Sequence, residues 1–158
     1  MLSFGSFYDV INVLRQGVTV VREMDTALTE LRKVSDESLD SLKSYQLETY
    51  KMADAVGTTA VQIMDSTADW VRLGKSMTEA KELASLSTKL LNVSEFEDIN
   101  DATQSLVSAT QAYKDVDPQI LVDKLNLVGN NFAISTDELA TGLQNAAAVL
   151  MTQGNDLD

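Results

Sequence analysis

The chain has 158 residues, of which 44% are hydrophobic, and it carries a formal net charge of −12 at pH 7. It contains no cysteine and no histidine, which removes disulfides, thiolate nucleophiles and the commonest general base and metal ligand. These absences argue against an enzyme and against a metal or other cofactor. The acidic balance argues against direct binding to nucleic acid, because the phosphate backbone is also negatively charged.

The composition also favours one fold class. A single proline and seven glycines are few for a β-rich or loop-rich chain. No apolar run approaches the ~20 residues that span a bilayer, and the N-terminus lacks the features of a signal peptide. We therefore expect an all-α protein, made in the cytoplasm and without a membrane span, with about seven helices in a bundle or an array of helical hairpins.

The first predicted helix covers residues 6–34 and carries two interleaved apolar rows beside one polar stripe. Steps of three and four residues over about four heptads resemble a coiled coil. Two interpretations stay open: the helix packs on its own domain, or copies associate through it. A helix lying on a membrane surface is a third, disfavoured because its polar stripe is not basic. The first row supplies the candidate self-association face: Ile11, Leu14, Val18, Val21 and Leu28. The second row runs through Val10, Val13, Val20, Met24, Ala27, Leu31 and Val34 and is broken by Gly17.

The next three predicted helices are marked by caps and glycines. Ser35 or Asp36 is expected to cap a helix that Gly57 ends. The third helix should start at Thr59 with a capping box to Gln62, and the fourth at Ser76 with a box to Glu79. Gly74 should stop the third helix, and Trp70 is more plausible as a core anchor than as a ligand platform.

An acidic link, residues 94–101, precedes the fifth predicted helix at 101–114. Its carboxylates could suggest calcium, but the link lacks the spacing, glycine and distal Glu of an EF-hand loop. We therefore expect these carboxylates to cap a helix and face solvent. Asp117 and Pro118 are expected to open the sixth helix, since proline is tolerated in the first helical turn.

The sixth helix is predicted to stop at Gly129, and the seventh to start with Ser135 as cap and Glu138 as its capping-box partner. The segment between them is either a structured turn or a contact surface for another copy or a partner. Gly154 follows the last helix as Gly74 follows the third. The candidate interaction or hinge residues are Gly74, Gly129, Asn130, Asn131, Phe132 and Gly154.

Four sequence blocks resemble, in order, the shared core region of phage tail tape measure proteins. They are DTALTELRKVSD (25–36), WVRLGKSMTEAKELASLSTKLLNV (70–93), DINDATQSLVSATQAY (98–113) and VGNNFAISTDELATGLQNAAAVL (128–150). The resemblance covers the chain from about residue 20 onward. It implies a siphophage or prophage structural protein that sets tail length during assembly and is released on DNA delivery.

The same resemblance implies the partners and the location. Expected partners are the tail tube protein, the tail assembly chaperones and the baseplate hub, with the virion tail lumen as the final location. The chain then divides into a long helix (1–34) and a helical core domain (35–158), a segment of a longer protein. The alternative is a helical interaction module of an adhesin or of a secretion-type assembly. Gene neighbourhood would separate the two.

Overall fold

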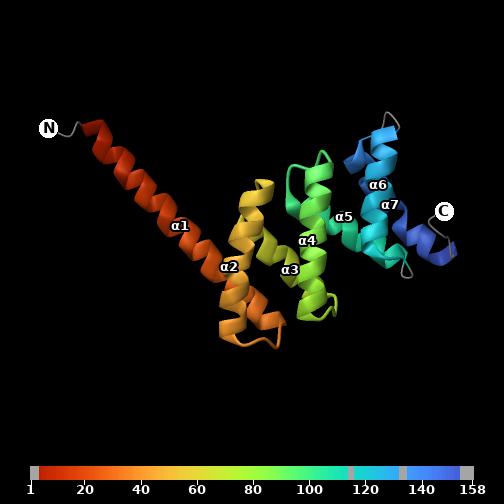
Figure 1. Cartoon of the computed structure of the whole chain (residues 1–158), viewed down its shortest axis with the longest axis horizontal. Helices are drawn as coiled ribbons and strands as arrows, with labels where there is room; N and C mark the ends of the chain where they lie inside the picture. Colours follow the sequence, from red (N-terminus) through yellow and green to blue (C-terminus); the bar gives the residue numbers. More distant parts are fainter. Residues whose placement is uncertain (1–3, 114–115, 132–134, 154–158) are drawn as a thin grey trace.

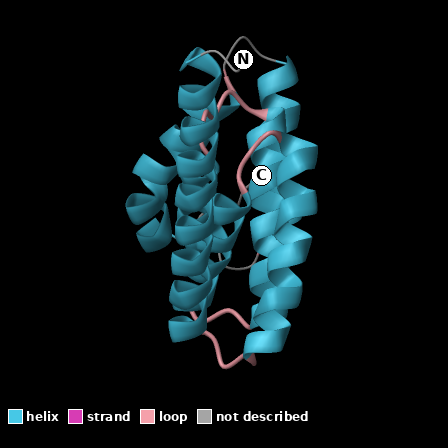
Figure 2. Ribbon diagram, turned by 90° about the vertical axis from the view of Figure 1, so that its left-hand side faces the viewer, coloured by secondary structure: helices cyan, strands magenta, loops and turns pink. Residues whose placement is uncertain are grey.

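The computed structural model describes residues 4–113, 116–131 and 135–153, and these residues form helices joined by short loops without a strand (Figures 1 and 2). The prediction of an all-α chain with seven helices and a long first helix is therefore confirmed. The helices are α1 (Phe4–Val34), α2 (Leu39–Val56), α3 (Ala60–Arg72), α4 (Met77–Val93), α5 (Ile99–Ala112), α6 (Pro118–Asn131) and α7 (Thr136–Gln153).

Most helix starts lie where the sequence places a capping side chain. Thr59 and Gln62 form a reciprocal capping box at α3, and Ser76 and Glu79 form another at α4. At α6 the Asp117 carboxylate accepts a hydrogen bond from the Gln119 backbone N–H at 2.8 Å. These caps satisfy backbone N–H groups that have no partner inside the helix.

Two predicted starts are displaced. The cap of α2 is Ser38, whose hydroxyl accepts from the Ser41 backbone N–H at 3.2 Å, so the prediction of Ser35 or Asp36 is wrong. Helix α5 begins two residues earlier than expected, because Asp98 accepts from the Asn100 N–H at 2.7 Å and acts as the cap. In both cases several neighbouring Ser or Asp residues can cap, and the local sequence does not choose among them.

Gly57 and Gly74 end α2 and α3 as predicted. Their φ angles are +71° and +85°, in the left-handed region that glycine reaches without a Cβ clash. In both cases the chain can therefore reverse within a few residues and send the next helix back along the previous one.

The buried side chains form two adjoining cores. The first joins the second half of α1 to α2 and α3, around Leu31, Leu42 and Ile63. The second joins α3, α4, α5, α6 and α7, around Trp70, Leu90 and Leu106. Helix α3 contributes to both cores, and Trp70 is a core anchor as expected.

Buried hydroxyls cross between helices inside these cores. Thr67 donates to the Ile63 carbonyl at 2.8 Å, so the Tyr45 hydroxyl, 2.6 Å away, donates to Thr67. By the same logic Ser66 donates to Thr103 at 2.8 Å, since Thr103 donates to a backbone carbonyl. These bonds tie α3 to α2 on one side and to α5 on the other.

None of the helices, over the residues that the structure describes, is long and apolar enough to cross a membrane.

Candidate interaction surfaces

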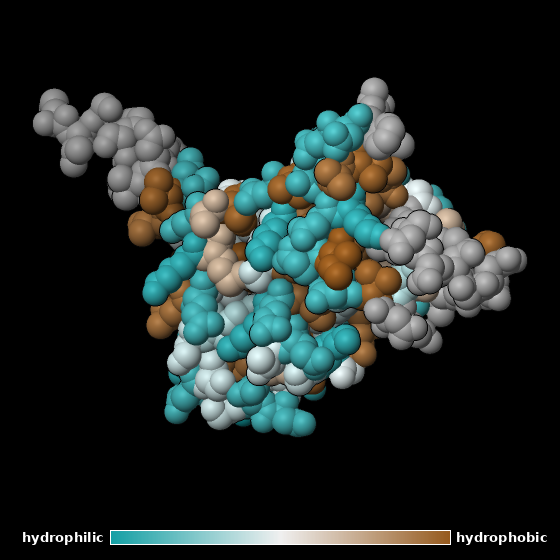
Figure 3. All heavy atoms as spheres, turned by 45° about the vertical axis from the view of Figure 1, so that its right-hand side comes forward, coloured by the Kyte–Doolittle hydropathy of each residue, from teal (hydrophilic) through white to brown (hydrophobic). Residues whose placement is uncertain are grey.

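The first half of α1 projects from the rest of the molecule, while its second half packs on α2 and α3 (Figure 1). We call residues 11–21 the arm and the helices from Met24 onward the body. Large apolar side chains of the arm are exposed: Val13 66%, Leu14 64%, Val18 53%, Val20 50% and Val21 68%. Figure 3 shows hydrophobic side chains gathered next to the grey N-terminal residues. Such an apolar surface is typical of an interaction site.

Four of the five residues predicted as a self-association face lie on this arm. Leu14, Val18 and Val21 are exposed and Ile11 is half-buried. Leu28 does not belong with them, because it is buried in the first core beside Met24 and Leu31. The row that carries all five residues is broken by Asp25, between Val21 and Leu28. The body covers α1 from Met24 onward, and sequence periodicity cannot show where that cover begins.

Val13 and Val20 belong to the second apolar row and were not assigned to the self-association face. They are as exposed as the first row over the arm. The signal that would have found them is the seven-residue step between Val13 and Val20, which the second row keeps on either side of Gly17.

The prediction that Gly129 stops α6 is wrong. The helix continues to Asn131, and Gly129 is not among the glycines with positive φ. A glycine is needed at position 129 because of a contact with another helix. A Cβ there would overlap the Thr136 Oγ1 atom and lie 3.5 Å from the Thr136 Cβ. Gly129 therefore lets the start of α7 approach the backbone of α6.

Asn130 and Asn131 form the last turn of α6. Asn130 donates to the Asn126 side-chain oxygen at 2.9 Å, and Asn131 donates to the Leu127 carbonyl at 2.7 Å. Both bonds are local and both side chains are exposed, which agrees with a structured helix end. Phe132 and Gly154, also predicted as interaction or hinge residues, lie outside the described residues.

The acidic link behaves as a helix start and a packing segment. Asp98 caps α5, Ile99 is fully buried, and Glu95 accepts a hydrogen bond from the Thr136 N–H of α7 at 3.0 Å. Among the described residues no three acidic side chains are grouped so that they could hold a metal ion. The carboxylates thus serve helix caps and inter-helix contacts.

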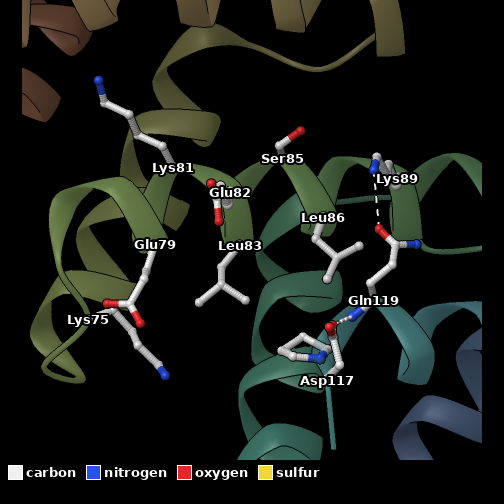
Figure 4. Close-up of a pocket in the computed structure, with 11 residues that line it drawn as sticks. Lys75, Glu79, Lys81, Glu82, Leu83, Ser85, Leu86, Lys89, Asp117 and Gln119 are labelled. Atoms are coloured by element: carbon white, nitrogen blue, oxygen red, sulfur yellow. Dashed lines mark hydrogen bonds between the residues drawn. The ribbon is translucent and has the colours of Figure 1, made fainter.

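A shallow pocket lies where α4 meets the start of α6 (Figure 4). Lys89 donates to the Gln119 side-chain oxygen at 3.2 Å across it, and Glu79 is engaged in the α4 capping box. Hydrogen bonds from the Ser76 hydroxyl and backbone lower the pKa of Glu79. In Figure 4 the Lys75 and Lys81 side chains extend in different directions, so the charged groups do not converge on one point.

Asp65 lies on α3, on the side that faces the second half of α1. Burial, followed by the neighbouring charge of Asp69, raises the pKa of Asp65, and Arg72 opposes that rise. Arg72 bridges the two helices, at 2.8 Å from Asp69 and 3.8 Å from Glu30. This group of charges links α1 to α3.

No family model matches the chain, and no solved structure matches it.

Proposed function

We propose that this chain is a structural component of a phage tail, of the tape measure class, which sets tail length during assembly and is released on DNA delivery. The observation that carries the proposal is the sequence resemblance of four blocks in the order that the family has them. The first block ends α1, the second spans the end of α3 and all of α4, the third covers α5, and the fourth covers the join of α6 and α7. The resemblance thus falls on the body.

The physical properties of the chain support a role through contact rather than chemistry. The sequence has neither histidine nor cysteine, and the charged side chains around the pocket of Figure 4 are spread over its rim. The α1 helix of 31 residues is about 46 Å long at 1.5 Å per residue. A folded body adds little length, so in this proposal the ruler length comes from other parts of the parent protein.

The partners in this proposal are the tail tube protein, the tail assembly chaperones and the baseplate hub. The chain is made in the bacterial cytoplasm and ends in the tail lumen. Its net charge of −12 disfavours direct contact with DNA in that lumen, because like charges repel.

Deleting residues 25–153 in frame from the parent gene and imaging the phage by electron microscopy tests the proposal. We expect tails that fail to assemble or that have an altered length. Normal tails of normal length, from phage that lack the segment, would contradict it. Lengthening the helical repeats that flank the segment tests whether other parts of the parent protein set the tail length. Tail length should then increase with the inserted length.

A second candidate is a helical interaction module of an adhesin or a secretion-type assembly. The exposed apolar side chains of the arm favour it, since a surface of that kind serves any helical assembly. Mass spectrometry of purified virions and of the cell-envelope fraction separates the two. Peptides of this chain in virion tails support the first proposal, and peptides in the cell envelope alone support the second.

A further inference from the structure

We propose that a polar pocket between the acidic link, α5 and α7 binds a linear aliphatic polyamine through its ammonium groups. The argument uses the charge of this pocket, its free hydrogen-bond acceptors and its size, and it does not depend on a role in a phage tail.

The pocket has a volume of about 600 Å³, which lies within the range of small-molecule sites. Three segments of the chain meet around it, and all of them are part of the body. The polar side chains that line it are Glu95 and Glu97 of the link, Asp101, Gln104 and Ser105 of α5, and Thr141 of α7.

The charge of the pocket is negative and uncompensated. Three carboxylates line it, and the described residues around it include no lysine or arginine. Glu95, Glu97 and Asp101 form no ion pair with a described residue. A pocket with three carboxylates and no basic side chain attracts a cation.

The wall of the pocket also holds a buried hydroxyl that the fold leaves unused. Ser105 is only 3% exposed and lines the pocket, yet its hydroxyl makes no hydrogen bond to a described residue. Other buried hydroxyls nearby are used internally: Ser87 and Thr103 each donate to a backbone carbonyl of their own helix. Because buried polar groups are normally hydrogen-bonded, the free Ser105 hydroxyl indicates a partner inside the pocket.

The free positions of the other polar groups are acceptors. The Gln104 amide nitrogen donates to the Asp69 carboxylate at 3.3 Å, which leaves the Gln104 side-chain oxygen available. One Glu95 oxygen accepts the Thr136 N–H at 3.0 Å, which leaves the other oxygen available. A primary ammonium group carries three donors and no acceptor, so it matches a lining of this kind.

The arrangement of the carboxylates favours an extended cation over a metal ion. Among the described residues no three acidic side chains are grouped so that they could hold one metal ion. A chain with several ammonium groups separated by methylenes brings its charges to separate carboxylates. Phe96, half-buried against the second core, also lines the pocket and offers an aromatic side chain to the methylenes and the ammonium groups.

The first test is calorimetric titration of the 158-residue chain with spermidine at low ionic strength. We expect saturable binding of one spermidine per chain. Putrescine and Mg²⁺ carry the same charge and are the competitors, and putrescine should displace spermidine at a lower concentration than Mg²⁺ does. No saturable binding, or displacement by Mg²⁺ at the same concentration as by putrescine, would overturn the proposal, because an acidic chain attracts any cation diffusely.

Removing two charges tests the position of the site. Glu97→Gln/Asp101→Asn should weaken spermidine binding about tenfold, while Glu95 stays unchanged because it bonds to α7. The matched control is Glu37→Gln/Asp40→Asn, which makes the same two substitutions in the link before α2 and in its first turn. The control should bind spermidine as the natural chain does. Equal affinity in the two variants would overturn the proposal, because binding would then follow net charge alone.

The Ser105 hydroxyl is tested separately from the charge. Ser105→Ala should weaken spermidine binding about tenfold, because a hydrogen bond to a charged group is lost. The melting temperature without spermidine should not fall, since the hydroxyl makes no internal bond. Ser87→Ala is the contrasting variant: it should lower the melting temperature and keep the affinity for spermidine. Unchanged affinity in Ser105→Ala would overturn the proposal.

A lysine side chain of another protein carries the same chemical group, so a compound with one ammonium group separates the two sources. N-acetyl-lysine methylamide presents one ammonium group on a flexible stem, as such a side chain would. It should bind about tenfold more weakly than spermidine or worse, because it reaches fewer carboxylates. Equal affinity would show that the pocket takes a single ammonium group, and would overturn the polyamine in favour of a lysine side chain.

Discussion

Thr136 lies against the backbone of Gly129, and this contact predicts the effect of adding one methyl group. Alanine is favoured over glycine inside a helix by about 1 kcal/mol. At Gly129 the new Cβ would overlap the buried Thr136 hydroxyl, so we expect Gly129→Ala to lower the free energy of unfolding by about 1–3 kcal/mol, as overpacking does.

Gly142 is the control for that measurement, because it is exposed in α7 with no atom within 4 Å of a Cβ built on it. Gly142→Ala should raise the free energy of unfolding by about 0.5–1 kcal/mol. Denaturant titrations of both variants give the comparison. A stabilising Gly129→Ala would mean that Thr136 rotates away freely.

Tyr45 is a second residue whose surroundings make a measurable prediction. Burial raises the pKa of Tyr45 to about 12, so the folded state favours the neutral phenol. The unfolded phenol ionises near pH 10. The stability is therefore complete below pH 10 and falls by roughly 2–3 kcal/mol as the pH rises to 12.

Tyr45→Phe should remove this pH-dependent loss while keeping the ring below Lys81, whose Nζ lies 4.4 Å from its centre. Near neutral pH the substitution should lower the free energy of unfolding by about 1 kcal/mol, because the hydrogen bond to Thr67 is lost. Exposed Tyr50→Phe is the control and should leave the alkaline profile unchanged. If Tyr45→Phe loses as much stability at alkaline pH as the natural chain does, the loss comes from other groups.

At the scale of the element, the start of α2 separates two serines of the same link. Ser38 caps the helix, so Ser38→Ala should cost about 1 kcal/mol. The Ser35 hydroxyl is buried without a hydrogen-bond partner, so Ser35→Ala should be neutral or stabilising. Thermal unfolding of both variants measures the loss of stability in each. A larger loss of stability in Ser35→Ala than in Ser38→Ala would support Ser35 as the cap, as the sequence predicted.

These helix ends also show which structural features a sequence carries. Thr59 with Gln62, and Ser76 with Glu79, were predicted because a capping box is complete within four residues. Gly129 was wrongly predicted to end a helix. It is a glycine because the start of α7 packs closely against it. In sequence, a glycine that ends a helix cannot be distinguished from one that allows another helix to pack closely. Of the candidate surface, the apolar rows were predictable, but the point where the body covers them depends on the packing of α2 and α3.

At the scale of the whole molecule, α1 is one continuous helix with two environments. Val21 and Leu28 occupy the same heptad position, seven residues apart, yet Val21 is 68% exposed and Leu28 is 9% exposed. The body stabilises only the second half of α1, because α2 and α3 pack on the helix from Met24 onward. The first half of α1 leaves large apolar side chains exposed.

The division of α1 predicts different costs for equivalent truncations. Leu28→Ala should lower the free energy of unfolding by roughly 2–3 kcal/mol, since it removes buried methyl groups from the first core. Val21→Ala should change it by no more than about 0.5 kcal/mol when the protein is dilute enough to be monomeric. The sequence also predicts that copies associate through this part of α1. On that prediction Val21→Ala should shift the protein toward monomer at high concentration, whereas Leu28→Ala should act only through the stability of the body. Denaturant titration at low concentration and sedimentation at high concentration measure the two quantities separately. Equal destabilisation of the dilute monomer by both changes would place the arm against the body and leave no free face for a second copy.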